Sequence, residues 1–241
     1  MLEPDTRLAS VDSNFLQQVQ RVCRKYGAVF ILDEMITGFR WHFNGAMHLY
    51  EVEPDLATFG KGMANGFAQA ALIGRREIME LGGIRNEGAE RVFLISSTHG
   101  CEMSAFGAFL AASKVAERDR VCDHMWAYGR KLMEGMHELA KEAGVEEGFR
   151  MHGFACSPYF TTFDRSGAPS LALRTLWAQE MVEQGVLMSY VTLSLAHGDR
   201  ELERTLEAAR KAFRIYARAW EEGTEGYLEG PVVKPVFRQF N

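Results

Sequence analysis

Asp33 is the first residue whose type and position suggest chemistry. It follows residues 28–32, an unbroken apolar run of β-formers that predicts a strand buried on both faces. A carboxylate at the end of such a strand is costly to bury unless it is paired, hydrogen-bonded or bound to a cation. Two explanations stay open: Asp33 holds a cationic ligand, or it serves the fold as a helix cap or a structural ion pair.

Lys61 is the second candidate, and it follows the next predicted strand. It stands between Gly60 and Gly62, with Gly66 close behind, so the backbone can turn tightly and approach a ligand. A desolvated lysine near another cation loses its proton more easily, and the free amine can attack a carbonyl to form a Schiff base. A phosphate-binding loop is the competing interpretation, although the sequence departs from GxxxxGK[ST].

A third candidate is the run Ser-Ser-Thr-His-Gly at residues 96–100, directly before a predicted helix. Hydroxyl groups and backbone amides at a helix start can bind a phosphate. The same residues would equally serve as a simple helix cap.

The elements that position these residues alternate between helix and strand in the first half of the chain. A helix from Asp12 or Ser13 to Tyr26, stopped by Gly27, precedes the apolar strand. Shorter strands are predicted at residues 56–59, 70–73 and 92–96. This order indicates an α/β fold with a mostly parallel sheet, whose ligands meet the carboxyl ends of the strands.

The second half of the chain follows a different pattern. Two helices come first, and they are followed by a predicted α+β layer. We therefore expect two domains, residues 1–119 and residues 120–241. The predicted elements are helices at 102–117 and 121–143, a strand at 153–164, a helix at 170–184, a strand at 186–195 and a helix at 199–220.

Bulk composition narrows the class of protein. The 241 residues are 47% apolar and carry a formal charge of −5 without long runs of one sign, which gives no indication of a nucleic-acid partner. The four cysteines form no CxxC and no metal spacing with the histidines, so we expect reduced thiols and no metal site. No apolar run reaches the ~18 residues that a membrane span needs. We expect a cytoplasmic protein with no membrane partner.

Taken together, these motifs resemble the class III aminotransferases, which are pyridoxal-phosphate enzymes of fold type I. The branch that contains glutamate-1-semialdehyde 2,1-aminomutase is the most similar. The resemblance covers nearly all of the chain and predicts part of the large cofactor-binding domain followed by a small carboxyl-terminal α+β domain. The residues that carry it are 27–40, which include Asp33-Glu34-Met35-Ile36-Thr37-Gly38-Phe39-Arg40, together with 54–56, 60–62, 75–79 and 195–199.

The resemblance implies a role for each matching residue. Lys61 would form the Schiff base with pyridoxal 5′-phosphate and then move a proton between substrate and cofactor. Asp33 would pair with the protonated pyridine nitrogen, and Met35 would pack on one face of the ring. Thr98 would reach the phosphate of a neighbouring subunit's cofactor, which implies a homodimer. The substrates would be a small-molecule amino donor and a carbonyl acceptor.

Two departures shape the functional prediction. Ile36 stands where many members have glutamine, and residues 189–191 do not match the aminomutase pattern, so aminotransferase and aminomutase both stay open. The chain also resembles only the carboxyl-terminal half of these enzymes. We therefore expect weak cofactor binding and no turnover without a complementing amino-terminal half. The alternative is a non-catalytic interaction protein that pairs with a full-length homologue.

Overall fold

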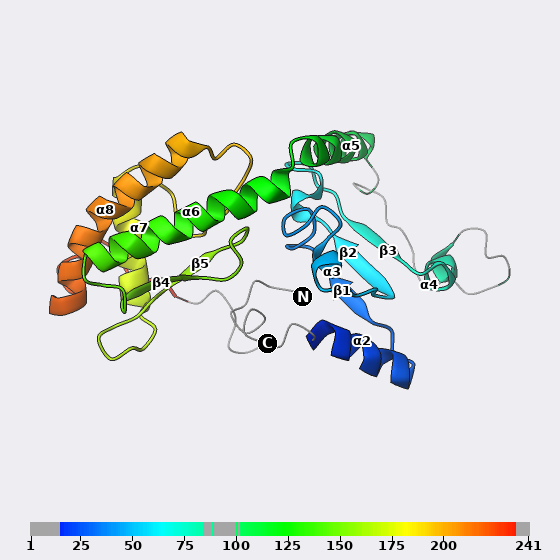
Figure 1. Ribbon diagram of the computed structural model, residues 1–241, viewed down its shortest axis with the longest axis horizontal. Coiled ribbons are helices and arrows are strands. Elements are labelled where there is room, and N and C mark those ends of the chain that lie inside the picture. Colours follow the sequence, from blue (N-terminus) through cyan, green and yellow to red (C-terminus); the bar gives the residue numbers. More distant parts are fainter. Residues whose placement is uncertain (1–14, 84–87, 89–99, 101, 235–241) are drawn as a thin grey trace. The chain divides into compact units, whose positions relative to one another are not determined.

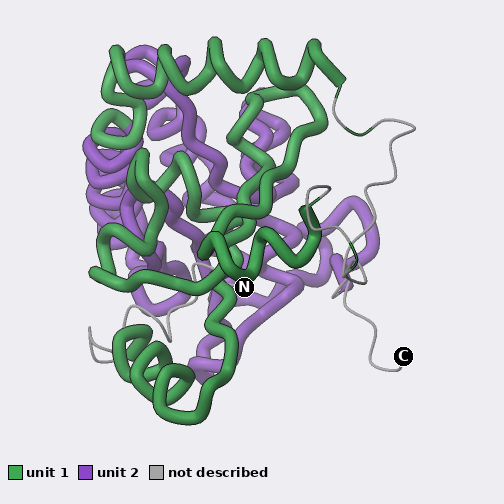
Figure 2. The backbone as a smooth tube through the Cα atoms, turned by 90° about the vertical axis from the view of Figure 1, so that its right-hand side faces the viewer, with its two compact units in different colours: residues 1–124 green, residues 125–241 purple. Residues whose placement is uncertain are grey.

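The computed structural model describes residues 15–83, 88, 100 and 102–234 (Figure 1). The chain divides into two compact units, Met1–His124 and Met125–Asn241, which are coloured separately in Figure 2. The predicted strand at 92–96 and Thr98, the residue predicted to bind a phosphate, lie outside the described residues.

Among the described residues of the first unit, three strands form a sheet. Its order is β1-β2-β3, with β1 at Ile31–Asp33, β2 at Leu56–Phe59 and β3 at Ala71–Gly74 (Figure 1). β1 and β2 pair in parallel, as predicted, and Asp33 lies opposite Thr58. β3 then pairs with β2 in the antiparallel direction. The carboxyl ends of β1 and β2 therefore meet at one edge of the sheet.

Helices of different lengths precede, separate and follow these strands along the chain. α2 (Phe15–Tyr26) ends where Gly27 adopts a φ of 67°, as the sequence predicted. The Gln20 side chain of α2 is buried and donates to the Glu53 carbonyl at 2.8 Å, which fastens the helix ahead of β2. The elements are α2 (Phe15–Tyr26), α3 (Ala46–Leu49), η1 (Lys61–Met63), α4 (Arg76–Met79), η2 (Glu80–Gly82) and α5 (Met103–Arg118).

The apolar strand is not buried on both faces, and that prediction was wrong. Phe30 and Leu32 are 6% and 3% exposed, but Val29 and Ile31 are 52% and 56% exposed. This alternation follows from strand geometry, because successive side chains point to opposite faces of a sheet. Within the described residues, one face of β1 packs on the core and the other lies open.

Asp55 ties the three strands together at their opposite edge. Its Oδ2 accepts from the Phe30 amide at 2.8 Å, and its Oδ1 accepts from Arg75 Nη1 at 2.9 Å. The Arg75 amide also donates to the Asp55 carbonyl. The Phe30 hydrogen bond and then the Arg75 guanidinium lower the pKa of the Asp55 carboxyl. Asp55 is thus a structural carboxylate at this end of the strands.

In its described part, the second unit contains an antiparallel hairpin, two long helices and most of a third helix, which begins in the first unit. The strand predicted at 153–164 was wrong in its extent, because β4 (Phe149–His152) and β5 (Tyr159–Thr162) are separate strands that pair with each other. Gly153, with φ 83°, starts the turn between them. The predicted strand at 186–195 is also wrong, since these residues form no strand. The helices are α6 (Val121–Glu142), α7 (Leu171–Glu183) and α8 (Asp199–Glu222).

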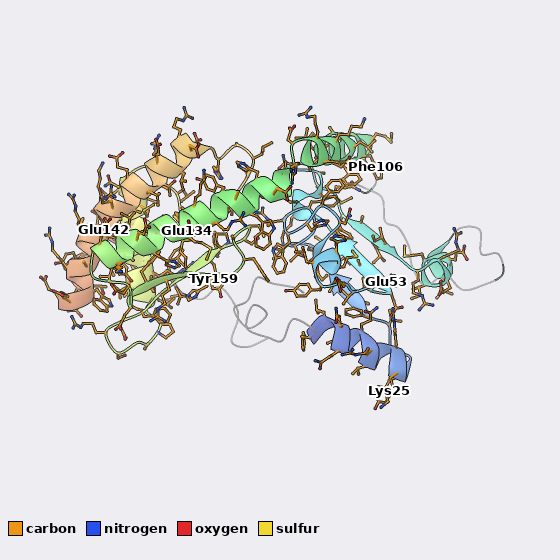
Figure 3. The ribbon with its side chains drawn as sticks, in the orientation of Figure 1. Lys25, Glu53, Phe106, Glu134, Glu142 and Tyr159 are labelled. Carbon is orange, nitrogen blue, oxygen red and sulfur yellow. The ribbon has the colours of Figure 1, made fainter. Side chains whose placement is uncertain are left out.

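An aromatic cluster forms the core of this unit. The centroid of the Trp177 ring on α7 lies 4.6 Å from the centroid of the Phe149 ring and 4.6 Å from that of the Phe213 ring. All three side chains are nearly inaccessible. Tyr216 on α8 donates its hydroxyl to the Gly148 carbonyl at 2.7 Å. Glutamates on the outer face of α6, such as Glu134 and Glu142, are exposed instead (Figure 3). The hairpin and helices share this core.

Candidate functional site

Asp33 and Lys61 lie at the same edge of the first unit's sheet. Asp33 is the last residue of β1, and Lys61 begins the η1 turn that follows β2. Since β1 and β2 are parallel neighbours, both residues emerge at the carboxyl ends of adjacent strands. The fold therefore brings together two residues that are separated by 28 positions in the sequence.

One oxygen of Asp33 is held by its surroundings. Its Oδ1 accepts from the Met35 amide at 2.9 Å and from the Thr58 hydroxyl at 3.1 Å. Among the described residues, Oδ2 takes part in no hydrogen bond or ion pair. The carboxylate is only partly buried, so its second oxygen can accept a donor from a bound group. This arrangement differs from the helix cap or ion pair that the sequence left open.

Lys61 combines an unusual backbone with an unpaired side chain. Its φ is 47°, a left-handed conformation that few non-glycine residues adopt and that clusters at functional sites. Lys61 is exposed, and no carboxylate in the described chain lies within ion-pair distance of its amine. The turn is anchored two residues later, where Met63 packs with Ala57 and Phe59. The amine is thus free while its backbone is fixed.

Met35 lies against the residue that precedes Lys61. A Cβ on Gly60 would fall 2.3 Å from the Met35 Cε and 2.8 Å from its Sδ. A larger residue at position 60 would therefore displace the end of the Met35 side chain from this contact. The thioether therefore lies at the edge that carries Asp33 and Lys61.

Glu34 belongs to the framework of the candidate site, although no role was predicted for it from the sequence. Its side chain is 0% exposed. The carboxylate accepts from the Thr37 hydroxyl at 2.5 Å, the Ala46 amide at 2.8 Å and the Met47 amide at 2.7 Å. The only sequence signal was a hydroxyl three residues after a carboxylate, because the two amides belong to a distant turn.

His42 and His48 stack on each other, and the pKa of His42 predicts how the stability of the fold depends on pH. Their ring centroids are 4.0 Å apart, and the Asn44 amide donates to His42 Nδ1 at 3.0 Å. Burial first, and then the neighbouring His48, lower the pKa of His42 below 6.5, while Asp123 opposes the shift. The unfolded chain therefore binds more protons here, so stability falls as pH drops below about 6.5 and levels off below the folded-state pKa.

We expect His42→Gln to lose less stability than the wild type between pH 7.5 and pH 5.5. Glutamine cannot titrate in this window, so the share of the pH dependence that comes from position 42 disappears. Urea denaturation midpoints at the two pH values measure the effect. His152 in the second unit also has a pKa lowered by burial and supplies a remaining slope in both proteins. Equal slopes in the two proteins would contradict the assignment.

Other predicted features lie elsewhere. Thr98 falls outside the described residues, and residues 189–191 belong to the second unit, where the Ser189 carbonyl accepts from Arg174 at 3.1 Å. Within the described chain, no three His, Cys, Asp or Glu side chains cluster as metal ligands would. In that same part, no helix combines the length and apolar character needed to cross a bilayer.

The chemistry of this edge fits a small aromatic cation that carries an aldehyde. The amine of Lys61 can bond to a carbonyl, and the free oxygen of Asp33 can accept from a protonated ring nitrogen. The Met35 thioether can pack on a ring, since sulfur contacts aromatic groups favourably.

Comparison with known proteins decides the family. The Aminotransferase class-III family matches residues 8–195. The chain belongs to the class-III aminotransferase family. A 3-aminobutyryl-CoA aminotransferase of Cloacimonas acidaminovorans is 34% identical over 82% of this chain and 46% of its own length. A glutamate-1-semialdehyde 2,1-aminomutase of Desulforamulus reducens is 34% identical over 85% of this chain and 48% of its own length.

Structural similarity agrees with this membership. An omega-transaminase from Sphaerobacter thermophilus matches with a TM-score of 0.72 and 26% identity, over 86% of this chain and 48% of that protein. The fold of this class-III chain is therefore that of the fold type I transaminases, and the cofactor of the family is pyridoxal phosphate. The chain spans about half the length of the curated relatives it matches.

Proposed function

We propose that this chain carries the covalent base for amino-group transfer with pyridoxal phosphate, and that Lys61 is that base. The observation that carries the proposal is the shared edge: Asp33 and Lys61 follow two adjacent parallel strands, and within the described residues one Asp33 oxygen and the Lys61 amine have no partner. When bound, the cofactor supplies an electron sink for the carbanion that forms on the substrate. The residues of this chain bind it, orient it and move the proton.

Each residue at the edge has a distinct task in this proposal. Lys61 would hold the cofactor through its aldehyde, with loss of water, and once the substrate amine displaces it the freed amine would move the proton at the substrate carbon. Asp33 keeps the ring nitrogen protonated through a charge-assisted hydrogen bond. Met35 covers one face of the ring. Thr98 would bind the phosphate of a second subunit's cofactor in a homodimer.

The reaction we propose is amino-group transfer, which is common to aminotransferases and aminomutases. The 34% identities to an aminotransferase and to an aminomutase are equal, so they do not separate the two reactions. The substrates are a small-molecule amino donor and a carbonyl acceptor. We further propose that the chain alone binds the cofactor weakly and turns over only when an amino-terminal half complements it.

Reduction with borohydride tests the proposal directly. The full chain is mixed with pyridoxal phosphate and reduced, and the modified peptide is mapped by mass spectrometry. A phosphopyridoxyl group on Lys61, in excess over the other lysines, is expected. Modification that is spread evenly over exposed lysines would overturn the proposal, because it would show no site at this edge.

Asp33→Asn is expected to weaken cofactor binding without disturbing the fold. The asparagine carbonyl can replace Oδ1 as acceptor for the Met35 amide and the Thr58 hydroxyl. The lost group is the free anionic oxygen. Hydrogen bonds to charged groups contribute about 1.5–3 kcal/mol, so binding should weaken by roughly 10- to 100-fold. Absorbance titration with pyridoxal phosphate measures this.

Asp199→Asn provides the matched control for that titration. Asp199 is a highly exposed carboxylate that pairs with Lys131 in the second unit. We expect it to bind the cofactor as the wild type does. If both substitutions weaken binding equally, the effect comes from general charge and Asp33 has no special role.

A further inference from the structure

Glu34 lies between Asp33 and Met35, and its buried side chain accepts three hydrogen bonds. We propose that Glu34 is a positioning residue: it holds residues 33–35 so that Asp33 and Met35 face the cofactor edge. This inference rests on the proposed function of Lys61 and Asp33. Glu34 would act through its two neighbours and would not touch the cofactor.

The side chain is held by three donors from two segments. Thr37 belongs to the turn that follows β1, whereas Ala46 and Met47 lie 12 and 13 residues from Glu34, at the start of α3. Three hydrogen bonds offset much of the cost of burying a carboxylate, and no cation in the described chain forms an ion pair with it. Glu34 therefore joins the end of β1 to the first turn of α3.

The backbone of Glu34 is held as firmly as its side chain. Its amide donates to the Thr58 carbonyl at 2.9 Å, which carries the contact with β2 one residue beyond Asp33. Its carbonyl accepts from the Gly38 amide at 2.9 Å. With both backbone groups and the carboxylate bonded, this residue has little freedom to rotate.

Fixing Glu34 places its two neighbours. The Met35 amide donates to Asp33 Oδ1, so the two residues are bonded around the buried glutamate. Both flanking side chains are partly accessible, whereas Glu34 is fully buried. If Glu34 moved, the Met35 amide would leave Asp33, and Met35 would leave its contact with Gly60.

Gly45 shows how closely the structure is built around this carboxylate. Its φ is 85°, and a Cβ there would fall 2.7 Å from Glu34 Oε1. Any larger residue would displace the carboxylate or the α3 amides that bind it. The loop before α3 is thus shaped to receive Glu34.

Paired substitutions at Thr37 test the proposal without removing the buried charge. Thr37→Val keeps the shape and deletes the hydroxyl that donates to Glu34, whereas Thr37→Ser keeps the hydroxyl and deletes a methyl group. Hydrogen exchange of single amides is measured by NMR on the full chain. The Met35, Ala46 and Met47 amides should exchange about tenfold faster in Thr37→Val than in Thr37→Ser, because Glu34 without the Thr37 hydroxyl is less fixed in position and the segment around it opens more often.

Borohydride capture of pyridoxal phosphate at Lys61 is the second readout. Capture by Thr37→Val should be about tenfold slower than by Thr37→Ser, because Asp33 and Met35 no longer hold their places. Capture by Glu34→Gln should be slower still, since the N–H groups of the glutamine amide would repel the α3 amides that donate to Glu34. Slower capture without selective exchange at Met35 would overturn the positioning role, and so would selective exchange with unchanged capture.

The two readouts separate this inference from the proposed function. If even the wild type fails to capture the cofactor at Lys61, the proposed function fails, and exchange at Met35 alone decides whether Glu34 holds the segment. A merely structural role would raise exchange equally at these amides and along the β2–β3 ladder. That uniform result would overturn the proposal whatever the capture experiment shows.

Discussion

Replacing Lys61 with arginine is expected to abolish covalent capture of pyridoxal phosphate at this position. A guanidinium stays protonated and cannot attack an aldehyde, whereas an amine can lose its proton and do so. Arginine keeps the positive charge and much of the length, so the loss isolates the nucleophile. The measurement is the amount of borohydride-stable phosphopyridoxyl group recovered on the peptide that contains position 61.

Lys141→Arg is the matched control for this change. Lys141 is also exposed, and it lies on α6 in the second unit. Its replacement should leave capture at Lys61 unchanged. Lys61→Arg should melt at the wild-type temperature, because Lys61 forms no ion pair within the described chain. Retained cofactor labelling of Lys61→Arg at the wild-type level, on other lysines, would contradict the assignment.

Trp177→Ala is expected to cause the largest loss of stability in the second unit. The ring is 0% exposed and contacts the rings of Phe149 and Phe213 at 4.6 Å. Truncating a buried tryptophan to alanine removes apolar contacts and leaves a cavity, at a cost of about 3–5 kcal/mol. Chemical denaturation followed by circular dichroism measures the free energy of unfolding.

Trp177→Phe separates packing from hydrogen bonding at the same position. The buried Trp177 Nε1 has no hydrogen-bond partner among the described residues, so phenylalanine deletes an unsatisfied donor along with part of the ring. Its cost should therefore be well below that of Trp177→Ala. If the two variants lose equal stability, the aromatic contacts in this core contribute less than their geometry indicates.

The helices of this protein could be predicted from the sequence because their signals are local. Apolar residues at helical spacing and glycine stops gave α2, α6 and α8 within a few residues. For α7 the cap is local too: Ser170 Oγ accepts from the Leu173 amide at 3.2 Å. A helix satisfies its backbone hydrogen bonds within one segment, so its pattern needs no partner.

The strands depended on contacts that the sequence does not display. Residues 186–195 have the composition of a strand, but the structure gives them no partner strand and they form none. β4 was missed because it is a strand only through its pairing with β5, which lies beyond the turn that Gly153 begins. A strand exists only through its neighbour, so burial and composition alone assign it poorly.

For the candidate site, the sequence by itself determined the family, and it predicted Asp33 and Lys61 as the reactive residues, because their types and glycine spacing are local. The tertiary structure alone decided that parallel pairing of β1 and β2 brings them to one edge. It also decided that Glu34 is buried against amides 12 and 13 residues away. A carboxylate looks the same in a sequence whether it faces water or a helix start, and only the folded chain supplies the donors that distinguish the two.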